Sequence, residues 1–279
     1  MTVLEPLAAR YAQWLGLPVA AVDGRSWDED PDAVRAMQIV LRVDRAAPPG
    51  RTALLEAAAS AAIAVCLDPR SAEGGEWHED VAAWVVGRIR KVSRRARGAQ
   101  WHAVQSLPGL TVTNGAGPVA GAGEAGPAER AGGAAEVRAL VPGLVAELPR
   151  EVGRLQVGGT DLPADDPGPP PPGLPVLWLN PSVPMTVGKA AAQVGHATMI
   201  AAALLEATGE HAALADWAAN GYRVAVRTAA LRAWRNLHPG DDPLAAWRRR
   251  RVVAVRDAGF TEVAPGTVTV LAQAPREWR

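Results

Sequence analysis

The chain has 279 residues, a single cysteine and no net charge, with 29 basic and 29 acidic residues. This length is sufficient for two domains with hydrophobic cores of their own. A neutral chain has no global field that attracts nucleic acid, so any such binding must come from local arginine clusters. The lone cysteine, Cys66, excludes an intrachain disulfide framework and favours a reducing compartment. Because there is no secretory leader and no apolar run of roughly 20 residues, the sequence predicts a cytoplasmic enzyme or binding protein, with no membrane contact.

The start of the chain predicts an extension followed by a βα unit. Residues 1–36 combine a short helix around 4–15 with an acidic, proline-containing connector, and we expect a peripheral extension here. Residues 37–43 have the alternation and β propensity of a strand, and the Ala-rich run 51–67 is strongly helical. A first domain is therefore predicted over residues 37–160.

One stretch of this first domain is strongly basic. Residues 88–97 hold six cations, namely Arg88, Arg90, Lys91, Arg94, Arg95 and Arg97. Such density favours a phosphate-facing surface, and the alternative is a solvated edge strand whose charges prevent aggregation. Farther along, the Gly/Ala/Pro-rich residues 115–135 predict a flexible loop.

A proline-rich segment, residues 161–173, predicts a stiff linker between two domains. The second domain then covers residues 174–279, with the expected element order β-α-β-α-β-β. Within it, residues 185–198 read MTVGKAAAQVGHAT, which is typical of a loop entering a helix that continues to about residue 207.

Three polar residues share one face of that apolar helix. The spacing i, i+4, i+7 aligns Lys189, Gln193 and His196. Lys189 is one of only two lysines in an arginine-rich chain, the other being Lys91, which favours a role that needs a compact ammonium.

A carboxylate is expected to face the start of this helix. Residues 252–256 predict a short strand, Asp257 opens the turn at its end, and a further strand covers residues 267–273. Asp257 thus lies at a strand end, from which it can reach Lys189. The alternative is that Asp257 only caps its own turn.

The two halves of the chain also match each other. Gly50-Arg51 corresponds to Gly188-Lys189, Trp84 to Trp217, Trp101 to Trp234, and the segment from Val141 to Leu155 to the segment from Asp257 to Leu271. We therefore predict an α/β fold made of two tandem copies of a compact four-stranded mixed sheet flanked by helices, which together form a pseudo-dimer.

The two copies differ in their polar residues. The first has Arg51, Ala58 and Val141 where the second has Lys189, His196 and Asp257. The second copy is therefore predicted to carry the chemistry, and the first is a degenerate copy.

At this point the second half resembles the type II, archaeal and eukaryotic, family of peptidyl-tRNA hydrolases. The resemblance covers about residues 174–275 and rests on three motifs in order, MTVGKAAAQVGHA at 185–197, RDAGFTE at 256–262 and PGTVTVL at 265–271. Departures are Thr186-Val187 in place of a usual Gly-Lys, and Asn180 and Ser182 where an Arg and an Asp are expected. The first copy keeps Arg42 and Asp44 at that place.

The resemblance implies hydrolysis of the ester that joins a peptide to tRNA, without metal or cofactor, in a family that usually pairs as a homodimer. It places Lys189, Asp257 and Thr261 in the active site, with the Thr267 hydroxyl close by. Gly188, Gln193, His196 and Arg256 are the further residues that we expect to bind the substrate, peptidyl-tRNA.

Ester hydrolysis needs an oriented water and a stabilised oxyanion. Asp257 is the candidate for the first task, and Lys189 with the helix N-terminus for the second. This hypothesis expects both side chains to share an open cleft, with the basic strand of the first copy on the same side, and it fails if Asp257 is buried against its own backbone and no cleft exists. The alternative function is a non-catalytic tRNA- or protein-binding relative.

Simpler roles remain open for several of these residues. His196 can be a buried core residue, and Thr261 and Thr267 can be strand residues selected for β propensity. Trp217, Trp234 and Trp247 can stack on bases, but core packing is the preferred interpretation. Arg248 to Arg251 can contact phosphate or be solvated charges.

Overall fold

The structure is a computed structural model that describes residues 2–18, 30–114, 134–259 and 261–278. The loop predicted over residues 115–135 lies almost entirely outside these ranges. None of the described helices is long and apolar enough to span a membrane.

The N-terminal part of the chain forms one group of elements. In order they are α1 (Glu5–Gly16), β1 (Arg35–Arg42), α3 (Arg51–Leu67), α4 (His78–Val86), β2 (Lys91–Ala96), α5 (Gly98–Val104), β3 (Gly109–Asn114), β4 (Ala135–Leu140), β5 (Gly143–Leu144), α6 (Arg150–Gly153) and β6 (Gln156–Val157). We call the part from β1 to β6 the first unit.

The C-terminal part forms a second group. Its elements are β7 (Val176–Leu179), α7 (Val187–Ala207), α8 (His211–Ala219), β8 (Ala225–Thr228), α9 (Leu231–Leu237), α10 (Pro243–Arg250), β9 (Val252–Arg256) and β10 (Val268–Gln273). We call this part the second unit. Its predicted helix and strands around Lys189 and Asp257 are confirmed.

Each unit has a mixed sheet, which confirms the predicted α/β class, but the first sheet has six strands where the prediction gave four, because the short strands β5 and β6 join it. The first sheet has the order β3-β4-β1-β2-β6, with β5 also pairing with β1, and the second has the order β8-β7-β10-β9. The pairs β1–β2 and β7–β8 are parallel, whereas β1–β4, β3–β4, β7–β10 and β9–β10 are antiparallel. The series β2-β1-β4-β3 and β8-β7-β10-β9 therefore have the same order and directions.

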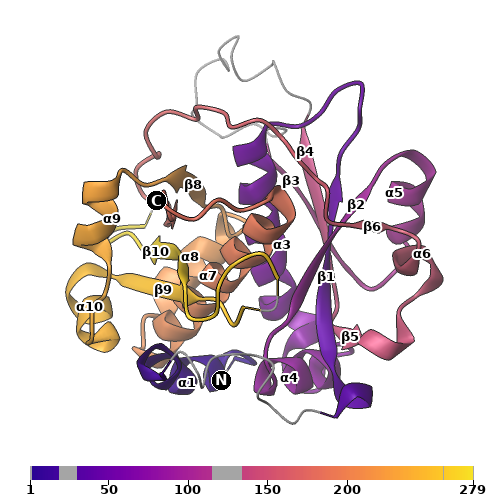
Figure 1. The fold of residues 1–279 in the computed structure, drawn as a ribbon. Coiled ribbons are helices and arrows are strands. Elements are labelled where there is room, and N and C mark those ends of the chain that lie inside the picture. The colour runs from indigo at the N-terminus through magenta and orange to yellow at the C-terminus, as the bar shows by residue number, and fades with distance from the viewer. Residues whose placement is uncertain (1, 19–29, 115–133, 260, 279) are drawn as a thin grey trace.

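The central helices α3 and α7 pack against each other between the two sheets (Figure 1). Each helix covers its own sheet and also reaches the other one, since α3 contacts β8 and α7 contacts β2. Small residues allow this approach, because a Cβ added to Gly195 of α7 would lie 3.0 Å from Cβ of Ala62 of α3. The Thr198 hydroxyl donates to the carbonyl of Ala59 across the same contact, at 3.2 Å.

The tryptophans that match between the halves are buried, which confirms their predicted core role. Trp101 and Trp234 each centre a small cluster away from the main core. Trp84 and Trp217 each donate from Nε1 to the carbonyl six residues later, both at 2.9 Å. In each case the chain passes through a left-handed residue on the way, Ile89 at φ 46° and Tyr222 at φ 55°.

The predicted N-terminal helix is present, but the expectation that it is peripheral is wrong. Its Leu7 and Tyr11 are buried in the main core, and the Tyr11 hydroxyl accepts the backbone N–H of Ala254 in β9, at 2.9 Å. Arg10 donates to the carbonyl of Gly87 at the end of α4, at 2.8 Å, and Figure 1 shows α1 beside α4. The helix thus joins the two units.

Candidate active site

The first turn of α7 is held by a capping contact. Thr186 is the N-cap, and its hydroxyl accepts the N–H of Lys189 at 3.2 Å. The same hydroxyl donates to Oε1 of Glu262 at 2.7 Å, and Oε2 of Glu262 accepts the N–H of Thr186 at 3.0 Å. The loop between β9 and β10 is therefore tied to the start of the helix.

Lys189 and Asp257 meet in an ion pair between Nζ and Oδ2. Their side chains are only 9% and 6% exposed, so the pair is largely removed from water. Gln193 donates from Nε2 to the same carboxylate oxygen at 2.8 Å, and its Oε1 accepts the hydroxyl of Thr269 at 2.5 Å. One carboxylate oxygen thus receives donors from two successive turns of α7.

The other oxygen of Asp257 belongs to a tight turn. Oδ1 accepts the N–H of Gly259 at 2.7 Å. Gly259 has φ 78°, and a Cβ there would lie 2.3 Å from Cγ of Pro265, so only glycine fits this position. The turn and the helix together give the carboxylate one orientation, and the predicted turn-capping role coexists with the ion pair.

The remaining predicted residues are dispersed around this pair. Nδ1 of His196 lies 3.1 Å from Nζ of Lys91, Thr261 is exposed in the β9–β10 loop, and Thr267 accepts the N–H of Asp257 through its backbone carbonyl at 2.8 Å. Arg256 is turned away, because its Nη1 donates to carbonyls at the end of α1, including that of Leu15 at 3.1 Å. Burial lowers the pKa of this guanidinium.

The first unit contributes backbone anchors near Lys189. The Ser93 hydroxyl of β2 donates to the carbonyl of Gly188 at 2.7 Å, and Nη2 of Arg51 donates to the carbonyl of Met185 at 3.0 Å. Strand β2 therefore contacts the start of α7 through Ser93.

The predicted basic surface at Arg88, Arg90, Lys91, Arg94 and Arg95 is not supported. Arg94 is buried and donates to Oε1 of Gln38 at 2.7 Å, and Lys91 points at His196. None of the five is among the exposed residues. The strand is also not a free edge, since β2 pairs with β1 on one side and with β6 on the other.

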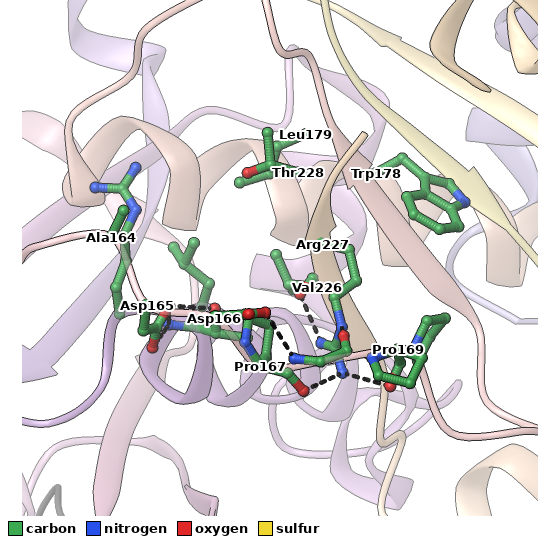
Figure 2. Close-up of a pocket in the computed structure, with 15 residues that line it drawn as sticks. Ala164, Asp165, Asp166, Pro167, Pro169, Trp178, Leu179, Val226, Arg227 and Thr228 are labelled. Atoms are coloured by element: carbon green, nitrogen blue, oxygen red, sulfur yellow. Dashed lines mark hydrogen bonds between the residues drawn. The ribbon is translucent and has the colours of Figure 1, made fainter. Parts of the chain in front are cut away.

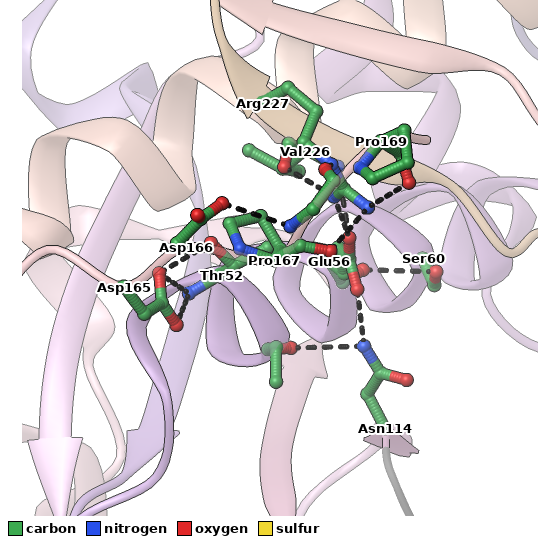
Figure 3. Close-up of polar contacts among 12 residues, drawn as sticks. Thr52, Glu56, Ser60, Asn114, Asp165, Asp166, Pro167, Pro169, Val226 and Arg227 are labelled. Atoms are coloured by element: carbon green, nitrogen blue, oxygen red, sulfur yellow. Dashed lines mark hydrogen bonds and ion pairs between the residues drawn. The ribbon is translucent and has the colours of Figure 1, made fainter. Parts of the chain in front are cut away.

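The place of Asp257 is taken in the first unit by Asn114, and the predicted match to Val141 is wrong. Strand β3 occupies the position of β9, and it ends at Asn114, whereas Val141 follows β4. Nδ2 of Asn114 donates to Oε2 of Glu56 on α3 at 2.7 Å (Figure 3). The sequence comparison failed here because residues 115–133 separate β3 from β4 and shift the register.

A pocket of about 400 Å³ lies beside the start of α3, under the linker. Figure 2 shows Pro167 and Pro169 beside the guanidinium of Arg227, and Trp178 also lines the pocket. A second pocket, of about 360 Å³, lies near Trp77. Neither is lined by Lys189 or Asp257, so the expected open cleft around the pair is not among these two pockets.

Two contributors to the site were missed from the sequence. Thr269 of β10 orients Gln193, and nothing in the local sequence pattern distinguishes its hydroxyl from that of an ordinary strand threonine. Glu262 lies inside a motif that carried the family resemblance, but its contact with Thr186 joins residues 76 positions apart, which local patterns do not reveal.

A comparison with known protein families gives a match over the C-terminal part of the chain. The model of peptidyl-tRNA hydrolase PTH2 matches residues 175–278. No curated protein and no solved structure gives a significant match to the chain. The second unit, with the paired Lys189 and Asp257, therefore matches the peptidyl-tRNA hydrolase PTH2 family, which confirms its resemblance to the type II enzymes.

Proposed function

We propose that the chain hydrolyses the ester bond of peptidyl-tRNA and releases peptide and free tRNA. The observation that carries this proposal is the contact of Lys189 with Asp257 at the first turn of α7, inside the segment that matches the family. A buried ion pair contributes little net stability compared with well-packed apolar residues. Its presence therefore favours a chemical role.

Each residue has a task in the proposed reaction. Asp257 orients or deprotonates the attacking water, because its carboxylate is fixed by Gln193 and Gly259. Lys189 and the N-terminal N–H groups of α7 stabilise the oxyanion. The released alcohol is the 3′-terminal ribose of tRNA, and the peptide leaves as a carboxylate.

Substrate contacts are proposed for four further residues. Gly188 lies in the first turn of α7, His196 lies on the same helix, and Thr261 and Thr267 belong to the β9–β10 loop. Arg256 is left out of this set, because its guanidinium is engaged with carbonyl oxygens of α1.

We propose that substrate entry moves the β9–β10 loop. Lys189 and Asp257 are nearly buried, whereas the contact of Thr186 with Glu262 that ties the loop to α7 is exposed. Release of this exposed contact is the step that we propose for opening the site.

We further propose that the units arose by tandem duplication and imitate a homodimer, with residues 161–173 as the connection. The shared series of four strands, with the same order and directions in both units, supports this view, as do the repeated Trp84 and Trp217 hydrogen bonds. The first unit lacks the Lys–Asp pair and serves as a partner for the second.

The test is release of free tRNA from N-acetyl-aminoacyl-tRNA by the purified chain. Lys189→Met and Asp257→Asn should each reduce kcat/KM at least about 100-fold. Glu210→Gln is the matched control, because it breaks another ion pair of the same unit, with Arg251, and should keep activity. Binding of tRNA without hydrolysis by the wild type would instead support the non-catalytic relative.

A further inference from the structure

Lys91 of the first unit projects into a slot that the second unit completes. Its Nζ lies 4.9 Å from the centre of the Trp84 ring and 3.1 Å from Nδ1 of His196 on α7. Lys91 and Ser93 alternate on β2 and both contact α7, so this face of the strand runs along the helix from His196 to Gly188.

The slot exists because α7 has a glycine beside the histidine. A Cβ on Gly195 would lie 3.1 Å from Cε and 3.2 Å from Cδ of Lys91, which is tighter than ordinary van der Waals contact. The aliphatic stem of Lys91 therefore passes over Gly195, and its ammonium ends at the imidazole.

Lys91 has a basic rather than an acidic partner. Within the described ranges, no carboxylate forms an ion pair with it, and the titratable groups that face it are Cys66 on α3 and His196 on α7. Burial lowers the pKa of Lys91 to about 7. Burial, together with the charges of Lys91 and Lys189, holds the pKa of His196 well below its usual value, so the imidazole is neutral.

We propose that Lys91 is a positioning residue for the site of the second unit, which it serves by holding His196 in the tautomer that carries its proton on Nε2. Below about pH 7 Lys91 is an ammonium, which has donors only, so Nδ1 of His196 must accept there, and the single proton of the neutral ring resides on Nε2. His196 then offers an Nε2–H donor to the substrate. This last step rests on the proposed function, whereas the tautomer does not.

The tautomer is tested by nitrogen NMR of the imidazoles at about pH 6, with His196→Gln to assign the signals. Wild type should show an unprotonated Nδ1 and a protonated Nε2 for His196. Lys91→Met keeps the stem but removes the donor, and should give mixed tautomers or a raised His196 pKa. Ser93→Ala is the control from the same face of β2 and should leave the His196 signals unchanged. A wild-type His196 with a protonated Nδ1, or signals unaffected by Lys91→Met, would overturn the proposal.

The consequence for substrate is tested by affinity for an amide-linked, non-hydrolysable peptidyl-tRNA analogue. Lys91→Met should weaken binding roughly threefold to tenfold, as expected for one hydrogen bond. In a His196→Gln protein the glutamine amide N–H replaces the Nε2–H donor and does not need Lys91 to orient it. Adding Lys91→Met to that protein should therefore weaken binding of the analogue less than about twofold. Equal losses in both backgrounds would contradict action through His196. If the wild type binds no analogue, the proposed function fails, while the NMR result still decides the role of Lys91.

Discussion

Asn114 and Asp257 lie at the carboxyl ends of matching strands, β3 and β9. Each is hydrogen-bonded to the central helix of its own unit. Asn114 donates to Glu56 of α3, and Asp257 accepts from Gln193 of α7. The acid–amide pair is thus reversed between the units. In the first unit the carboxylate is on the helix, where Glu56 forms an ion pair with Arg227 of β8 at 3.0 Å. In the second unit the carboxylate is at the strand end, where Asp257 forms an ion pair with Lys189.

Removal of one charge from the Lys189–Asp257 pair should destabilise the protein. Asp257→Asn keeps the size of the side chain but leaves the ammonium of Lys189 buried and unpaired, at a cost of about 3 kcal/mol in the free energy of unfolding. Urea denaturation measures the change. Glu210→Gln, in a more exposed pair, should cost less than about 1 kcal/mol. Equal costs would show that the Lys189–Asp257 pair is not buried in solution.

The contact between α3 and α7 should not tolerate a side chain at Gly195. Gly195→Ala places a methyl group 3.0 Å from Ala62, so the helices must separate slightly, at a cost of about 1 to 3 kcal/mol. The control is Gly153→Ala, since nothing lies within 4 Å of the added Cβ there. A Gly195→Ala protein as stable as the wild type in urea would contradict the close packing of the units.

Stability should rise with pH above neutrality because of Lys91. Burial lowers its folded-state pKa to about 7, while the unfolded lysine stays protonated, so the unfolded state binds more protons between about pH 7 and 10. From pH 6.5 to 8.5 the wild type should gain about 1 to 2 kcal/mol relative to Lys91→Met. A constant difference between the two proteins would mean that Lys91 titrates normally.

The linker should depend on Arg227 for its protection from proteolysis. Arg227 donates from Nε to the carbonyl of Gly168 at 2.7 Å, and Asp165 accepts the N–H of Thr52 at 2.9 Å. Arg227→Met removes the first anchor and should increase cleavage before Asp165 by an Asp-specific protease roughly tenfold. Arg223→Met, at an exposed position, should have no effect. Unchanged cleavage of the Arg227 variant would show that the linker is held elsewhere.

Helical spacing was sufficient to predict the core of the site. Lys189 and Gln193 lie one turn apart, so both reach Asp257, and the strand–turn–strand pattern predicted the position of that carboxylate. The capping contact of Glu262 with Thr186 depends on the path of the β9–β10 loop, which has no periodicity to read.

Two predictions, the basic surface on β2 and the peripheral N-terminal helix, are wrong because charged composition does not by itself indicate exposure to solvent. The density of arginines suggested that β2 is a surface, but Lys91 and Arg94 face protein groups on its two sides, His196 and Gln38. The acidic connector suggested a peripheral N-terminus, although the apolar face of α1 with Leu7 and Tyr11 belongs to the core. In both cases the burial depends on partners more than 50 positions away.

The central claim is that Lys189 and Asp257 carry out ester hydrolysis, and single-turnover release of tRNA from N-acetyl-aminoacyl-tRNA tests it most directly. The enzyme is in excess, urea is absent, and the temperature is one at which Asp257→Asn remains folded. Under these conditions the account predicts rapid release of tRNA by the wild type and by Glu210→Gln. Release by Lys189→Met and Asp257→Asn should be slower by at least about 100-fold. Wild-type rates in either of these two variants would contradict the assignment of the site.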